Sequence, residues 1–247
     1  MRGHSLAEVV RPLHLAALFC LLTVLAGCAT VNPRLRYSLE ELYVSSVDGR
    51  ADLRYFPDRG LDVQQVLGWS GGEGLSPPQP EGGRFDVLAL SSGGPDGAFG
   101  AGALKGLAAA GSRPTYEIVT GVSTGALMAP FVFAGSSDDA TVERLYTSGE
   151  MGRLLGAPNV FAALSGPALY PSSRIETYMR KVYTADLLRR IAAEHARGRR
   201  LLIATVNLDA NRLVVWNMGR IAQIGTSDAL RLFKDVIRAS IAIPGAL

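Results

Sequence analysis

The sequence predicts an α/β domain with three layers, in which a mostly parallel central sheet lies between helices. Three observations lead to this fold class. Short apolar runs of strand length alternate with longer runs of helical periodicity. Two glycine-rich turns each follow a predicted strand and precede a predicted helix. The second turn, residues 121–125, has the pattern Gly-x-Ser-x-Gly, which turns a strand into a helix so sharply that the serine hydroxyl is exposed.

The first strand and helix of this pattern lie between Phe85 and Gly111. Residues 85–91 form a short apolar run suited to a buried strand, and residues 92–97 form the first glycine-rich turn. Residues 98–110 have the composition of an apolar helix. Nearly every face of this helix carries apolar or small side chains. We therefore expect the helix to be buried and its neighbours to pack closely against it.

The second strand and helix hold the serine. Residues 116–120 have the pattern of a strand that leads into the elbow at residues 121–125. The elbow begins and ends with a glycine, Gly121 and Gly125. We expect that a side chain at either position would clash with the neighbouring strand or helix. A helix follows, in which Pro130 is expected to introduce a kink or an early end.

The remaining chain continues the alternation of helices and strands. The last expected helix is amphipathic and begins after a serine or threonine that can cap it. The expected elements are a helix at 137–148, a loop over the site at 159–171, a charged helix at 187–200, strands at 201–206 and 212–217, and a helix that starts at Thr226 or Ser227.

Ser123 is the predicted nucleophile, because the elbow presents its hydroxyl at the start of a helix. The unpaired backbone N–H groups of Gly93, Gly94 and Thr124 form the predicted oxyanion hole, since N–H groups at a helix N-terminus stabilise a developing negative charge. Purely structural roles remain open at this point: Ser123 could only cap its helix, and the two glycines could only supply a turn.

Several segments of the chain resemble the patatin-like phospholipase family. They are LALSSGGPDGAFGAGALKGL, YEIVTGVSTGAL, NLDANRLVVWNMGRIA and RASIAIPG, and the resemblance covers residues 85–247. It implies an enzyme that hydrolyses acyl esters of lipids, of the phospholipase A or lysophospholipase kind, with a serine and an aspartate and without a histidine. The family's first turn usually has three glycines and a basic residue; here Ser92 replaces the first glycine and Asp96 stands at the basic position.

The general base that activates Ser123 is not evident from the sequence. His195, the only histidine after the predicted signal peptide, lies in a polar stretch and is expected to be solvated at the surface. Asp209 follows a strand, but its segment resembles a part of the family's pattern other than the Asp-Gly motif. No Asp-Gly pair follows Ser123, so we expect the catalytic aspartate beyond residue 247 and the sequence to be a C-terminally truncated form. The other aspartates have the pattern of caps or surface charges: Asp138, Asp139, Asp186, Asp228 and Asp235.

The N-terminus has the features of a bacterial lipoprotein signal peptide, expected to be residues 1–27. Arg2 and Arg11 accompany an apolar stretch that is too short to span a bilayer comfortably and that ends in Leu-Ala-Gly-Cys. This ending resembles a lipobox and implies cleavage before Cys28 and lipidation of that cysteine; an ordinary signal peptide is the alternative. Ala29 after the cysteine implies the outer membrane of the bacterial cell envelope, facing the periplasm.

One domain is expected after the signal peptide and its extension. Residues 28–84 are expected to be a tether that also packs on the domain, with a short helix at 35–44, a strand at 53–56 and a linker at 71–83. Residues 85–247 are expected to be the catalytic domain, incomplete at its C-terminus.

Composition limits the function further. The net charge is only +3 and no basic run with interleaved aromatic residues occurs, which argues against nucleic acid as a partner. Histidine, cysteine and carboxylate residues do not cluster, so we expect no metal and no other cofactor. Cys28 would be the only cysteine after cleavage, which leaves no internal disulfide. The expected partners are a lipid acyl ester and, through Cys28, the membrane.

Three other functions remain open. A truncated or decayed lipoprotein could bind lipid without hydrolysing it. A nucleotide-binding unit is disfavoured, because the strict G-x-G-x-x-G and G-K-[ST] patterns are absent from the sequence. Acyl transfer to an acceptor other than water would use the same residues as hydrolysis.

Overall fold

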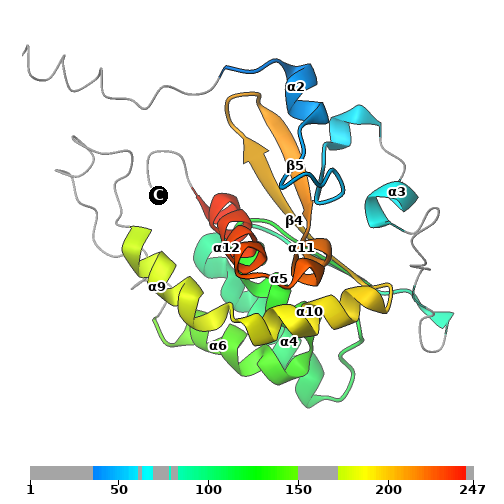
Figure 1. Cartoon of the computed structure of the whole chain (residues 1–247). Coiled ribbons are helices and arrows are strands. Elements are labelled where there is room, and N and C mark those ends of the chain that lie inside the picture. The colour runs from blue at the N-terminus through cyan, green and yellow to red at the C-terminus, as the bar shows by residue number, and fades with distance from the viewer. Residues whose placement is uncertain (1–35, 61–62, 69–77, 79–82, 150–171, 243–247) are drawn as a thin grey trace, which may run out of the picture. The chain divides into compact units, whose positions relative to one another are not determined.

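The computed structural model of the chain describes residues 36–60, 63–68, 78, 83–149 and 172–242 (Figure 1). All elements below lie in one compact unit, which begins at Leu39. The expected signal peptide with Cys28 and the expected loop at 159–171 lie outside the described residues.

Within the described residues, the central sheet has five strands in the order β1-β5-β4-β3-β2 (Figure 1). Strands β2, β3 and β4 run parallel, whereas β5 and β1 are each antiparallel to their neighbours. The predicted fold class, a sheet that is mostly parallel in its core and flanked by helices, is therefore confirmed. The strands are β1 (Arg54–Tyr55), β2 (Val87–Leu90), β3 (Ile118–Gly121), β4 (Arg200–Asn207) and β5 (Arg212–Asn217).

Helices flank this sheet. In the part of the chain that the structure describes, no helix is long and apolar enough to cross a membrane. The α-helices are α2 (Leu39–Val44), α3 (Val63–Leu67), α4 (Gly97–Ala109), α5 (Thr124–Ala134), α6 (Asp139–Thr147), α9 (Ser172–Val182), α10 (Ala185–Ala196), α11 (Met218–Ile224) and α12 (Ser227–Ile241). The short 3-10 helices are η2 (Pro57–Arg59), η4 (Gly94–Asp96) and η5 (Ser136–Asp138).

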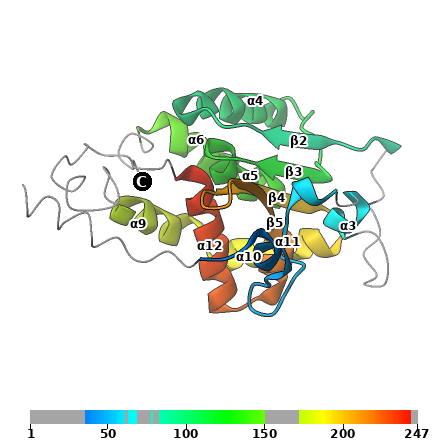
Figure 2. The same ribbon diagram turned by 90° about the horizontal axis from the view of Figure 1, so that it is seen from above.

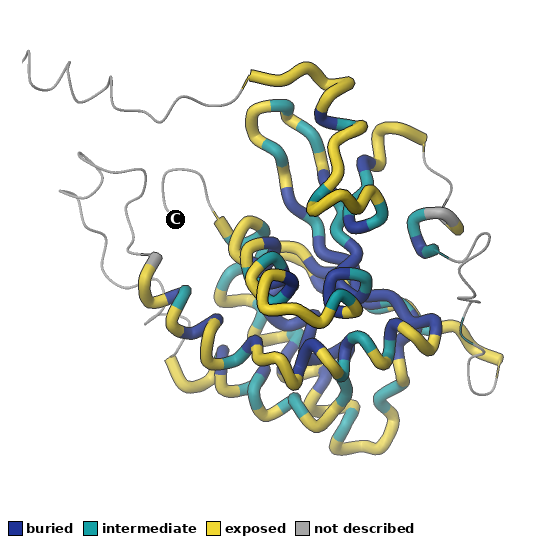
Figure 3. The backbone as a smooth tube through the Cα atoms, in the orientation of Figure 1, coloured by how far each residue is buried: buried dark blue, intermediate teal, exposed yellow. Residues whose placement is uncertain are grey.

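Helix α5 lies at the centre of the core. It packs against β2, β3 and β4, and every residue from Thr124 to Phe133 is buried (Figure 3). The ring of Tyr183 stacks on Phe131 with 5.3 Å between the ring centroids, and its hydroxyl donates a hydrogen bond to the carbonyl of Leu127 at 2.9 Å. A helix without a polar face is stable only when it is covered all round. The packing of the core around α5 therefore fixes the position of its N-terminus.

Pro130 does not end α5 early. The helix continues from Thr124 to Ala134, although proline lacks the N–H that would bond to the preceding turn. Because the helix is buried from Thr124 to Phe133, tertiary packing offsets the missing hydrogen bond.

Helix α4 is more exposed than the sequence predicts. Only Ala101 and Leu104 of its residues are buried, and Phe99 is 84% exposed. The reason is the strand order, because β2, which leads into α4, is an edge strand of the sheet (Figure 2). In the described part of the chain α4 packs mainly on α6, so the expectation of a helix that is buried on all sides is wrong.

The segment from Leu39 to Arg59 packs on the sheet. Its strand β1 pairs with β5, and Leu53 is completely buried in the main core. Leu42 and Phe56 form a smaller cluster with Val214 of β5. This part of the chain thus extends the sheet by one strand and covers part of β5.

Candidate active site

The backbone of Ser123 has the geometry of a nucleophile elbow. Ser123 stands between the end of β3 and the start of α5, with φ 53° and ψ −121°. Positive φ is unusual for a residue with a side chain, and the described residues show it at only two other such positions, Asp48 and Asn211. Strain of this kind is kept only where the surrounding structure enforces it, and it is found preferentially at functional sites.

The two glycines of the elbow allow its close packing. A Cβ atom on Gly125 would overlap the backbone carbonyl of Leu90, the last residue of β2. A Cβ atom on Gly121 would lie 2.7 Å from the carbonyl oxygen of Gly125. The strand, the turn and the helix therefore touch through backbone atoms, and the turn is tight because no side chain separates them.

The first glycine-rich turn lies directly against this elbow. Thr124 donates a side-chain hydrogen bond to the carbonyl of Gly94 at 3.2 Å, and a Cβ atom on Gly97 would overlap the Thr124 methyl group. Among the described residues, the backbone N–H groups of Gly93, Gly94 and Thr124 have no hydrogen-bond partner. The structure therefore brings the proposed nucleophile and three unpaired donors to one place.

Tyr146 of α6 contacts both the elbow and the end of the first glycine-rich turn. Its hydroxyl donates a hydrogen bond to the carbonyl of Thr124 at 3.3 Å, and its ring lies where a side chain at Gly97 would be. Burial raises the pKa of Tyr146, so the hydroxyl stays protonated and remains a donor. This contact is not predictable from the sequence, in which Tyr146 is only one apolar position of an amphipathic helix.

The expectation that His195 is solvated is wrong. His195 is fully buried near the end of α10, where Gly219 of α11 leaves room for its ring. It precedes β4 and therefore lies at the opposite end of the sheet from Ser123. Burial, together with the positive charges of Arg200 and Arg220, lowers the pKa of His195 to about 3, which keeps the ring neutral at pH 7.

Asp209 also lies away from the elbow. It stands in the turn of the hairpin between β4 and β5, which extends beyond the rest of the sheet (Figure 1). Ile203 is the partner of Gly121 in the sheet, and β4 continues from there to Asn207, roughly 13 Å further along the strand. The structure does not bring Asp209 to Ser123.

The remaining aspartates after Ser123 serve mostly in ion pairs. None of these pairs includes a residue of the elbow. Asp138 pairs with Arg190, Asp139 with Arg113, Asp186 with Arg189 and Asp228 with Arg231. In the described residues, no group of three or more histidine, cysteine or carboxylate side chains is placed to hold a metal ion.

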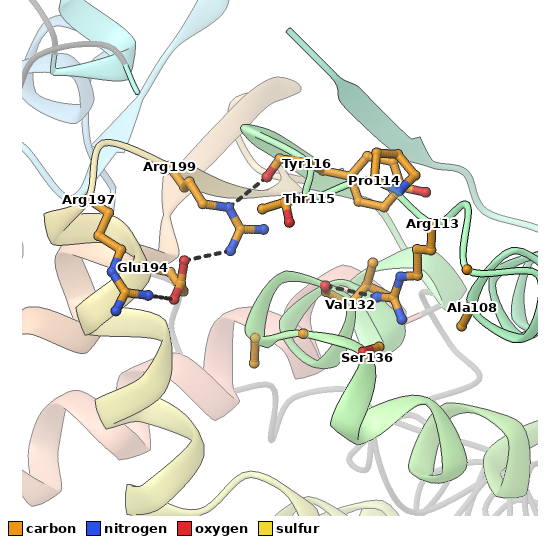
Figure 4. Close-up of a pocket in the computed structure, with 13 residues that line it drawn as sticks. Ala108, Arg113, Pro114, Thr115, Tyr116, Val132, Ser136, Glu194, Arg197 and Arg199 are labelled. Carbon is orange, nitrogen blue, oxygen red and sulfur yellow. Dashed lines mark hydrogen bonds and ion pairs between the residues drawn. The ribbon is translucent and has the colours of Figure 1, made fainter. Parts of the chain in front are cut away.

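A cavity of about 480 Å³ lies at the other end of α5 from Ser123 (Figure 4). Arg113 donates to the carbonyl of Val132 and Arg199 to that of Phe133, so two guanidinium groups cap the C-terminal end of α5. These donors already have partners, and the cavity is remote from the elbow. Its polar character is explained by the structural role of the two arginines.

An α/β sheet with a strained serine between strand and helix, beside unpaired N–H groups, defines the class of proteins with a nucleophile elbow. Within this class, the family model of the patatin-like phospholipases matches residues 88–247, which is 160 of the 247 residues. The chain belongs to the patatin-like phospholipase family, a family of lipid acyl hydrolases, as the motifs in the sequence predicted. A search among curated proteins found no match.

Proposed function

We propose that this protein hydrolyses acyl esters of lipids with Ser123 as the nucleophile. The observation that carries the proposal is the strained backbone of Ser123, held at the elbow beside three unpaired N–H groups. The Ser123 hydroxyl adds to the ester carbonyl carbon as its proton passes to a base. The alcohol then leaves with a proton, and water releases the fatty acid from the serine.

The proposed oxyanion hole consists of the backbone N–H groups of Gly93, Gly94 and Thr124. These donors are fixed by the contacts of Thr124 with Gly94 and Gly97, so they need little rearrangement when negative charge develops on the ester oxygen. The basic residue of the family's turn is replaced by Asp96, which is exposed. We therefore expect a lower rate than a hole with a nearby positive charge would give.

The proposed base is an aspartate, as in the serine–aspartate dyad of the family. None of the aspartates that follow Ser123 in the 247 residues belongs to an Asp-Gly pair, and Asp209 lies in the distant hairpin. We propose that the base is the aspartate of the family's Asp-Gly motif, a motif that does not occur after Ser123 in the 247 residues. The support is the resemblance, together with the finding that no carboxylate among the described residues is hydrogen-bonded to the Ser123 hydroxyl.

We also propose that the protein acts at a membrane, in the bacterial cell envelope. The support is the sequence pattern before Cys28, which resembles a lipobox, and Ala29, which implies the outer membrane. A lipid on Cys28 would keep the enzyme close to lipid substrates. Mass measurement of the mature protein tests this: an acylated N-terminal Cys28 is expected, and an unmodified cysteine would contradict it.

Hydrolysis of a short-chain p-nitrophenyl ester tests the catalytic proposal. We compare the 247-residue chain with a form extended to the next in-frame stop, and each of the two with its Ser123→Ala variant. We expect the extended form to be active and its Ser123→Ala variant to lose activity by about a thousandfold or more. Unchanged activity in Ser123→Ala would refute the role of Ser123 as the nucleophile. Activity of the 247-residue chain would show that a base lies within it.

A second candidate is a lipoprotein that binds lipid without hydrolysing it. The observation in its favour is that, among the described residues, the Ser123 hydroxyl makes no hydrogen bond to a carboxylate or a histidine. This candidate predicts that phospholipid vesicles retain the protein while neither form releases fatty acid. Release of fatty acid that depends on Ser123 excludes it.

A further inference from the structure

Ser240, near the end of α12, contacts the backbone of the proposed nucleophile. The N–H of Ser123 donates a hydrogen bond to the Ser240 hydroxyl oxygen at 2.9 Å. The same hydroxyl donates to the carbonyl of Ala204 in β4 at 2.7 Å. The two residues are 117 positions apart in the sequence, so only the fold brings them together.

Both hydrogen bonds use the hydroxyl in a fixed orientation. A serine hydroxyl has one proton, and here it points to the carbonyl of Ala204. The oxygen lone pairs then remain to accept the N–H of Ser123. Removal of the hydroxyl would leave the Ser123 N–H and the Ala204 carbonyl without this partner, in a region that is only partly open to water.

The hydroxyl also extends the contact between two parallel strands. Gly121 of β3 and Ile203 of β4 are the last paired residues of this ladder. Beyond this pair the chain turns into the elbow, in which Ser123 has positive φ and its N–H bonds to Ser240. The Ser240 hydroxyl bridges Ser123 and Ala204.

We propose that Ser240 is a positioning residue, which holds the Ser123 backbone in its strained conformation and so fixes the nucleophile relative to the oxyanion hole. Because its N–H is occupied by Ser240, Ser123 contributes no N–H to that hole, which is left to Thr124 and the glycine turn. A small displacement of a reacting atom is costly for catalysis, so loss of this support acts on the rate more than on substrate binding.

This inference rests on the proposed function, and its kinetic test uses the form of the protein that shows Ser123-dependent ester hydrolysis. Ser240→Ala removes the hydroxyl without lowering helix propensity, and Ser240→Thr keeps a hydroxyl. Ser227→Ala, at the exposed start of the same helix, is the matched control. We expect Ser240→Ala to lower kcat about tenfold or more with KM changed less than about threefold, and Ser240→Thr to recover most of kcat.

A second measurement does not depend on activity. Amide hydrogen exchange of Ser123, measured by NMR, should be slow in the wild type and in Ser227→Ala. In Ser240→Ala we expect it to be about tenfold faster or more, whereas the unfolding midpoint in urea falls only moderately, so that the variant remains fully folded in the assay.

The results separate the two proposals. If Ser123→Ala is inactive but Ser240→Ala has the wild-type kcat and the wild-type exchange rate, the role of Ser240 is refuted and the proposed function stands. If no form hydrolyses the ester, the proposed function fails, and the exchange rate alone decides whether Ser240 holds Ser123. A positioning role would also be refuted if the loss of kcat in Ser240→Ala follows a loss of stability and Ser240→Thr does not restore kcat.

Discussion

Single glycines in this protein differ in what surrounds them. Gly125 in α5 faces the backbone carbonyl of Leu90, whereas Gly102 in α4 has no atom within 4 Å of the place where a Cβ would stand. The same substitution therefore has opposite consequences at the two positions. At Gly125 the strand cannot move aside without a change in the sheet, and at Gly102 alanine only improves the helix propensity.

Gly125→Ala is expected to lower the free energy of unfolding by about 2 kcal/mol or more and to abolish most ester hydrolysis, because β2 and the elbow must separate. Gly102→Ala is the matched control and is expected to be neutral or stabilising by up to about 1 kcal/mol. Urea unfolding and the ester assay measure both effects. Equal stability of the two variants would contradict the close packing of the elbow.

The buried imidazole of His195 predicts a dependence of stability on pH. Its pKa is lowered from 6.5 to about 3 in the folded protein, so between these values the unfolded chain binds a proton that the folded protein does not. The free energy of unfolding should therefore fall as the pH is lowered from 6.5 towards 3, by at most about 1.4 kcal/mol per pH unit from this group.

The measurement is urea unfolding between pH 4 and pH 7 for the wild type and for His195→Gln. The variant is expected to be less stable at pH 7, because its buried site is altered, but to show a smaller slope with pH. An identical slope in the two proteins would mean that His195 does not titrate as its burial requires.

At the scale of elements, the two ends of α5 have different tasks. Its N-terminus carries Ser123 and Thr124, and its C-terminal carbonyls accept hydrogen bonds from Arg113 and Arg199. The Arg199 guanidinium also lies over the ring of Phe133, with 4.5 Å to the ring centroid. Cations at a helix C-terminus are favourable because the unpaired carbonyls there carry partial negative charge.

Arg199→Leu is expected to lower the free energy of unfolding by about 2–3 kcal/mol, because buried carbonyls lose a charged donor and Glu194 loses a partner. Arg197→Leu is the control, since Arg197 also pairs with Glu194 but its side chain is 71% exposed. Its effect should stay below about 1 kcal/mol. Similar losses in both variants would show that the surface pair, not the helix cap, carries the stabilisation.

At the scale of the whole molecule, the segment before the family match takes part in the fold. Strand β1 extends the sheet beyond β5, and Leu53 beside it is completely buried in the main core. Leu53→Ala is expected to cost about 2–5 kcal/mol of unfolding free energy, as for other buried leucines. Val44→Ala, on the 70% exposed Val44 of α2, should change stability little. Comparable unfolding midpoints would contradict the packing of this segment in the core.

The parts of this molecule that the sequence predicts are those set by neighbouring residues. Strands β4 and β5 follow from apolar runs and a turn, and the capping of α12 by Thr226 follows from its residue type. The elbow likewise follows from five consecutive residues. Tyr146 and Ser240 could not be placed, because they act through contacts 22 and 117 residues away.

Two of the wrong expectations, those for His195 and α4, have the same origin. His195 looks solvated because its sequence neighbours are polar, but helix α11 packs over it from elsewhere in the chain. Helix α4 looks buried because its composition is apolar, but the order of the strands puts its strand at an edge. Both depend on the arrangement of the whole sheet, which local patterns do not determine.

Covalent labelling with a fluorophosphonate tests the central claim, that the strained Ser123 is the nucleophile, most directly. Such a reagent phosphonylates an activated serine, and mass spectrometry identifies the modified peptide in the 247-residue chain and in the extended form. We expect one adduct on Ser123 in the form that hydrolyses the ester, and none in Ser123→Ala. An adduct on another serine, or no adduct in either form, would contradict it.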